Sequence, residues 1–124
     1  LDSTSAAAYG YIMQARSARG EVDSAMLLTD SILKYTKPED KPEFWSMRAR
    51  IFFRNKMLDS CAQNYLRALE LYPDMTIIYH QLGRVYMNMD QNQKAREYFN
   101  EFLKREPESE LIPQTENFLH ELER

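Results

Sequence analysis

Hydrophobic residues recur at steps of three and four positions along the chain, which is the spacing of one face of an amphipathic helix. One such stripe runs from Ala8 to Ala18, and a second runs from Met26 to about Tyr35. A last stripe runs from Leu111 to Leu122 and carries glutamates on its opposite face. Only three glycines and five prolines occur in 124 residues. This pattern predicts an all-α fold.

The middle of the chain repeats itself at an offset of 34 residues, and seven positions match in class. The small positions allow two antiparallel helices to approach closely, the aromatic positions fill the space beside them, and each proline ends a helix. The first copy consists of Trp45, Ala49, Phe52, Cys61, Tyr65, Ala68 and Pro73. The second copy consists of Tyr79, Gly83, Tyr86, Ala95, Phe99, Phe102 and Pro107.

This pattern resembles the tetratricopeptide repeat (TPR), a pair of antiparallel helices of about 34 residues. Tyr79, Leu82 and Gly83 begin a close match to that family, whereas Arg48 stands where leucine is usual. The resemblance implies an α-solenoid of three helix-turn-helix repeats plus a C-terminal capping helix. We expect a single domain over residues 1–124, with a degenerate repeat 1 at about 6–39, repeat 2 at 42–75, repeat 3 at 76–109 and the capping helix at about 110–124.

Residues capable of catalysis or metal binding are sparse. His80 and His120 have no cysteine or carboxylate at ligand spacing, so we expect no metal site. Cys61 takes a small position of the repeat, which favours a buried thiol over a nucleophile. No phosphate-binding loop or Ser/His/Asp arrangement occurs. We therefore expect no enzyme activity and no cofactor, and we assign Met13, Met26 and Met57 to gaps in the core.

Composition narrows the class of partner. The net charge of −3 and the lack of a basic stripe disfavour nucleic acid. No apolar run approaches the roughly 18 residues of a membrane span. The chain begins with Leu1 and not with methionine, so we expect an excised fragment or a processed product. The compartment stays open, with the cytoplasm favoured.

The resemblance also implies a binding surface, because the first helix of each TPR pair lines a concave groove. Three arginines and several apolar residues fall on it, a mixture that suits a peptide with acidic and apolar side chains. The alternative is that these arginines only solvate the surface. The implied residues are Glu43, Ser46, Met47, Arg50, Phe53 and Arg54 in repeat 2, Ile77, His80, Gln81, Arg84, Met87 and Asn88 in repeat 3, and a less defined set of Gly10, Gln14 and Ser17 in repeat 1.

The same mapping argues against one ligand class. Chaperone-binding members of the family hold a peptide's terminal carboxylate with lysines, asparagines and an arginine on successive first helices. The matching positions here are Gly10, Gln14, Met47, Ile77 and Gln81, so we expect no such clamp.

The leading hypothesis is therefore a non-catalytic scaffold or adaptor that binds a partner peptide or protein segment in the concave groove. One alternative is a structural or self-assembling segment of a longer solenoid. Another is a regulatory or recruitment domain of a larger multidomain protein. A fold alone does not decide among these functions.

Overall fold

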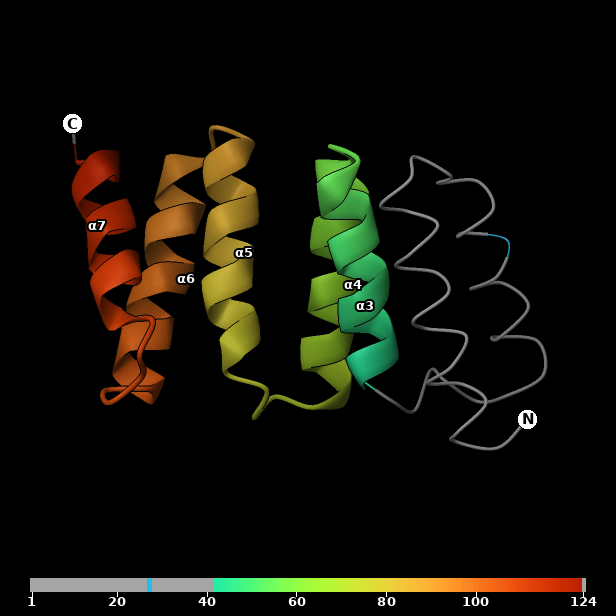
Figure 1. Cartoon of the computed structure of the whole chain (residues 1–124), viewed down its shortest axis with the longest axis horizontal. Helices are drawn as coiled ribbons and strands as arrows, with labels where there is room; N and C mark the ends of the chain where they lie inside the picture. Colours follow the sequence, from blue (N-terminus) through green and yellow to red (C-terminus); the bar gives the residue numbers. More distant parts are fainter. Residues whose placement is uncertain (1–26, 28–41, 124) are drawn as a thin grey trace. The chain divides into compact units, whose positions relative to one another are not determined.

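The computed structural model describes Leu27 and residues 42–123. Repeat 1, expected at about 6–39, lies outside the described residues except for Leu27, and Gly10, Met13, Gln14, Ser17 and Met26 all lie outside them. Between residues 42 and 123 every regular element is a helix (Figure 1), which confirms the all-α prediction for this range. The helices are α3 (Pro42–Arg54), α4 (Leu58–Leu71), α5 (Ile77–Asn88), α6 (Asn92–Arg105) and α7 (Ile112–Leu122).

The chain divides into two compact units, residues 1–72 and 73–124. The first contains the antiparallel pair α3 and α4, and the second contains the pair α5 and α6 followed by α7. The second helices of the two pairs begin and end 34 residues apart, at 58–71 and 92–105. The period of the sequence is thus also the period of the helices.

The turn inside each pair has the same backbone conformation. Lys56 and Asp90 have positive φ angles of 61° and 58°, the left-handed conformation that closes many helix C-termini. Around Lys56, the amide of Met57 donates to the carbonyl of Phe52 at 2.9 Å. Around Asp90, the amide of Gln91 makes the equivalent bond at 2.9 Å. Each first helix therefore ends in a Schellman turn that reverses the chain within three residues.

In the first unit, small side chains lie where α3 and α4 meet. Ala49, Cys61 and Ala68 have no exposed surface, and Tyr65 is almost completely buried beside them. A larger side chain at any of the three small positions would separate the two helices, because such interiors are close-packed. Five of the seven repeat positions of the first copy are therefore interior positions: Ala49, Phe52, Cys61, Tyr65 and Ala68.

The second unit has a tighter helix contact. A Cβ atom added to Gly83 would lie 2.5 Å from two carbon atoms of the Phe99 ring. Phe99 is fully buried, as is Ala95 one turn earlier on α6. The absence of a side chain at Gly83 thus lets the ring occupy the space between α5 and α6.

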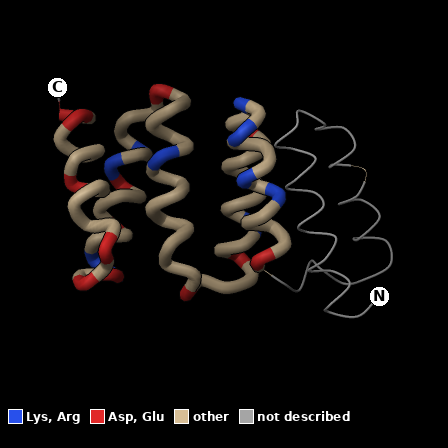
Figure 2. Tube along the Cα trace, in the orientation of Figure 1, with Lys and Arg blue, Asp and Glu red and all other residues tan. Residues whose placement is uncertain are grey.

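Helix α7 covers the end of this pair. Phe118 stacks on Phe99 with the ring centroids 5.4 Å apart, and Thr115 is completely buried. The Arg96 guanidinium on α6 donates to the carbonyl of Leu122 at 3.3 Å. Pro113 lies in the first turn of α7, where a missing amide hydrogen costs nothing. Acidic residues mark the loop before α7 and its outer face (Figure 2).

Candidate functional site

Helix α3, the first helix of its pair, exposes three of the six residues assigned to it. Glu43, Arg50 and Arg54 are exposed, and basic positions run along α3 in Figure 2. The other three are half-buried: Ser46, Met47 and Phe53. Core packing fixes the orientation of this face of α3, because Ala49 and Phe52 on the opposite side of the helix are buried.

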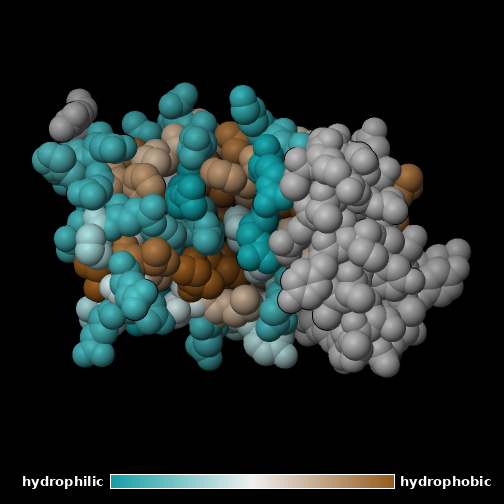
Figure 3. All heavy atoms as spheres, in the orientation of Figure 1, coloured by the Kyte–Doolittle hydropathy of each residue, from teal (hydrophilic) through white to brown (hydrophobic). Residues whose placement is uncertain are grey.

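The first helix of the second unit exposes two of its six assigned residues. Ile77 is 40% exposed at the start of α5, and Asn88 is exposed at its end. Asn88 donates from its side-chain amide to the carbonyl of Arg84 at 2.7 Å. Gln81, Arg84 and Met87 are half-buried. In Figure 3 a hydrophobic band crosses α5 and α7, bordered by hydrophilic side chains.

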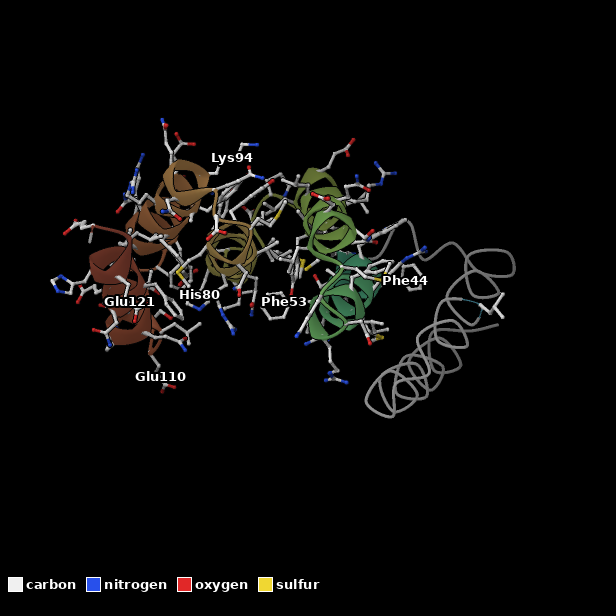
Figure 4. All side chains as sticks on the ribbon, turned by 90° about the horizontal axis from the view of Figure 1, so that it is seen from above. Phe44, Phe53, His80, Lys94, Glu110 and Glu121 are labelled. Atoms are coloured by element: carbon white, nitrogen blue, oxygen red, sulfur yellow. The ribbon has the colours of Figure 1, made fainter. Side chains whose placement is uncertain are left out.

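His80 does not lie on an accessible surface, which corrects its assignment to the groove. It is 1% exposed and points from α5 toward α7 (Figure 4). The imidazole packs against Phe102 and Phe118, with ring centroids 5.2 and 6.1 Å away. The assignment was wrong because α7 packs over this position, and the family pattern of the first helix alone does not include that helix.

The hydrogen bonds of His80 define its tautomer. The Thr115 hydroxyl donates to the carbonyl of Leu111 at 2.7 Å, so its oxygen accepts from Nδ1–H of His80 at 2.9 Å. Burial lowers the pKa of His80, and the charge of Arg84 lowers it further, while a hydrogen bond with Gln114 opposes both. His80 is therefore a neutral interior group that ties α7 to α5.

Cys61 is a buried thiol, as the sequence predicts. It has no exposed surface, and burial raises its pKa to about 12, although a backbone hydrogen bond at Phe53 lowers it slightly. A thiol that stays protonated is a poor nucleophile.

Within 42–123 no three His, Cys, Asp or Glu side chains come together to hold a metal ion. None of the described helices is long and apolar enough to cross a membrane.

Met57 and Arg48, two further residues noted in the sequence, take places that their environment explains. Met57 was assigned to the core, but it is 44% exposed, because it precedes α4 as the N-cap residue. Arg48 stands at an inward-facing position of the repeat, and its guanidinium carbon lies 5.9 Å from the centroid of the Phe52 ring. The arginine thus packs on an aromatic face in place of the usual leucine.

Sequence reasoning missed a second surface, on the α6 side of the second unit. Tyr79, Tyr86 and Tyr98 form an aromatic row there, beside a hollow that Lys94 and Glu97 also line. Figure 4 separates Lys94 on this side from His80 between α5 and α7. Tyr79 and Tyr86 are repeat positions, but Tyr98 is not, so only its spacing from them could have indicated the row.

Residues 77–109 match the family model described as the tetratricopeptide repeat. No curated protein sequence matches this chain closely. The structure is similar to the first TPR of Spaghetti (RPAP3) bound to HSP90 peptide SRMEEVD, with a TM-score of 0.79 at 19% identity over 99% of this chain and 94% of that chain. It is also similar to the N-terminal domain of stress-induced protein-1 (STI-1) from C. elegans, with a TM-score of 0.78 at 16% identity over 98% and 96%. A third similar structure is the Sgt2 TPR domain from Aspergillus fumigatus, with a TM-score of 0.74 at 19% identity over 94% of this chain and 75% of that chain. At these identities the likeness shows the fold, a helical-repeat array.

Proposed function

We propose that this chain, a tetratricopeptide-repeat protein by its match at residues 77–109 and by its fold, is a non-catalytic interaction module. Its ligand is an extended or helical segment of a partner protein. The proposal is supported by the match to the repeat family and by the burial and high pKa of Cys61, the one thiol of the chain.

The observation that carries the proposal is that matching first-helix positions of the two repeats both reach solvent. Arg50 on α3 and Arg84 on α5 are 34 residues apart and both reach solvent, as do Arg54 and its counterpart Asn88. One turn earlier on each helix, Met47 and its counterpart Gln81 are half-buried. A surface whose residues recur once per repeat suits the binding of an extended segment, with one part of the segment on each repeat.

The charge of the first-helix surface indicates which kind of partner segment would bind to it. The assigned first-helix residues include three arginines and one glutamate, Glu43, although the chain carries a net charge of −3. Guanidinium groups bind carboxylates through paired hydrogen bonds, and the half-buried Met47 and Met87 offer adaptable apolar contacts. We therefore expect a ligand with acidic residues beside apolar ones.

The assigned set needs one change. His80 is interior and is removed from the proposed contact residues. The remaining eleven residues, and the concave groove in which they would act, belong to the proposal.

A terminal-carboxylate ligand is a specific alternative, since the similar RPAP3 domain is bound to the HSP90 peptide SRMEEVD. Met47, Ile77 and Gln81 stand at three clamp positions and supply no positive charge. Titration of the whole chain with SRMEEVD should therefore give no more binding than titration with its C-terminal amide. Saturable binding of the free acid that the amide lacks would establish the clamp and overturn this part of the proposal.

The experiment that tests the proposed function selects short peptides on the immobilised chain and then compares charge reversals. Arg50→Glu should weaken binding of a selected acidic peptide by about fivefold or more, the effect of losing an attraction and adding a repulsion. Lys104→Glu is the matched control, because Lys104 is an exposed cation on α6, outside the proposed surface. Equal affinities for the two variants would exclude the α3 face as the binding surface.

A further inference from the structure

The second unit has a hollow of about 300 Å³ on the side away from His80, which we call the tyrosine hollow. Its volume lies at the small end of protein ligand sites, which suits one large side chain. Six residues line it: Tyr79 and Tyr86 from α5, and Lys94, Glu97, Tyr98 and Glu101 from α6.

Three tyrosine rings form one wall of the hollow. Tyr98 is stacked on Tyr86 with centroids 5.4 Å apart and planes at 11°, and Tyr79 lies 6.3 Å from Tyr98. Burial raises the pKa of Tyr98, and the nearby hydroxyls of Tyr86 and Tyr79 and the carboxylate of Glu97 raise it further. Three tyrosines and the carboxylate of Glu97 thus line the same hollow. Aromatic faces and carboxylate oxygens both attract cations.

The chain already places two of its own cations on this row. The guanidinium carbon of Arg105 lies 4.7 Å from the Tyr79 centroid, and its Nε donates to Glu101 at 2.7 Å. At the other end, the ammonium group of Lys94 lies 5.2 Å from the Tyr86 centroid. Arg105 therefore shows how a guanidinium is held here: one face against a tyrosine ring and an N–H on a glutamate.

Glu97 offers a carboxylate beside the tyrosine row, as Glu101 does, but no arginine is bonded to it among residues 42–123. It lies one helical turn before Glu101, lines the hollow, is exposed, and forms no ion pair with any residue from 42 to 123. Because Arg105 already pairs with Glu101, the lining carboxylate that has no ion pair among residues 42–123 is that of Glu97. The hollow therefore lacks a cation beside its middle ring.

We propose that the tyrosine hollow binds an arginine side chain of a partner protein, with the guanidinium between the tyrosine row and the carboxylate of Glu97. Arginine fits better than lysine because its planar group stacks on rings and donates two parallel hydrogen bonds to one carboxylate. The hollow favours a basic residue, whereas the first-helix surface favours acidic ones. It therefore adds a second specificity that does not depend on the proposed function.

The test titrates the whole chain with N-acetyl-arginine amide and follows the tyrosine ring resonances by NMR. N-acetyl-citrulline amide is the neutral, isosteric probe, and a Tyr98→Phe variant assigns the central ring. We expect arginine to shift the signals of Tyr79, Tyr86 and Tyr98 saturably and citrulline to leave them unchanged. Glu97→Gln should weaken the arginine effect about threefold, the scale of an exposed ion pair.

The control is Glu116→Gln, which neutralises an exposed glutamate on α7 and should leave the titration as in the parent chain. Equal shifts with arginine and citrulline would overturn the proposal, as would arginine shifts confined to other tyrosines. If dilution without any probe shifts the same three signals, the arginine belongs to a second copy, and the assignment to a different partner is overturned. Because this readout uses no acidic peptide, its failure leaves the first-helix proposal unaffected.

Discussion

At the scale of single residues, Ala49 and Gly83 occupy the same repeat position but have different neighbours. Ala49 is fully buried, and the aromatic residue at the matching position of its partner helix is Tyr65. At Gly83 a Cβ would lie 2.5 Å from the ring of Phe99. The sequence shows that both positions need small residues, but only the placement of the ring shows that one of them excludes a methyl group.

Gly83→Ala should lower the free energy of unfolding. A methyl group forced against the buried Phe99 costs about 1–3 kcal/mol, which exceeds the gain of about 1 kcal/mol from better helix propensity. Urea unfolding followed by circular dichroism measures the difference. A variant more stable than the parent would mean that the ring moves aside at no cost.

His80 was placed in the groove from the sequence, and the structure moves it to the interior. The error has a physical cause, since the burial of a position on α5 depends on α7, which follows some thirty residues later. The hydrogen bond between His80 and Thr115 could not be predicted, because a threonine in a helical pattern does not indicate its tertiary partner.

The neutral state of His80 predicts a pH dependence. Its pKa in the folded chain is lowered from 6.5, so its contribution to stability is present above pH 6.5 and is lost as the pH falls. The groups that face it from α6 and α7 are uncharged, and Arg84 on its own helix adds to the effect. Urea unfolding above and below pH 6.5 should show this loss.

His80→Gln is the control for that measurement, because glutamine keeps an N–H donor and does not titrate. The variant should lose less stability on acidification than the parent chain. Parallel pH curves for the two proteins would assign the acid sensitivity to other groups.

At the scale of the elements, the repeat predicted the helix pairs because aromatic, small and proline positions each constrain packing locally. The turn conformation was not predicted, since Lys56 carries none of the signals of a left-handed residue. Asp90 takes the same conformation more readily, because its short polar side chain tolerates it. The shared Schellman turn therefore rests on helix pairing and not on the turn residues alone.

Lys56→Gly should stabilise the first unit by about 0.5–1 kcal/mol, because glycine removes the steric cost of a positive φ. Asp90→Gly should gain less, which makes it the internal comparison. The fluorescence of Trp45, the single tryptophan, reports unfolding of the first unit. A destabilised Lys56→Gly variant would show that its side chain makes contacts worth more than the strain.

At the scale of the whole molecule, the fold could be predicted from seven recurring positions, whereas the surfaces could be predicted only in part. First-helix positions such as Arg50 follow from register, whereas His80, assigned to the same face, is buried under α7. The tyrosine hollow did not follow, since it depends on Tyr98 and Lys94 of α6 meeting two rings of α5. A pattern of one helix cannot specify a site built from two.

The central claim is that the first helices bind the partner, and amide chemical shifts measured by NMR during titration with a selected acidic peptide test it most directly. We expect the largest changes at exposed or half-buried first-helix residues, such as Met47 and Arg50 on α3 and Met87 and Asn88 on α5. Residues on the outer face of α6 should change little. Shifts concentrated on α4 and α6, with α3 and α5 unaffected, would contradict the account.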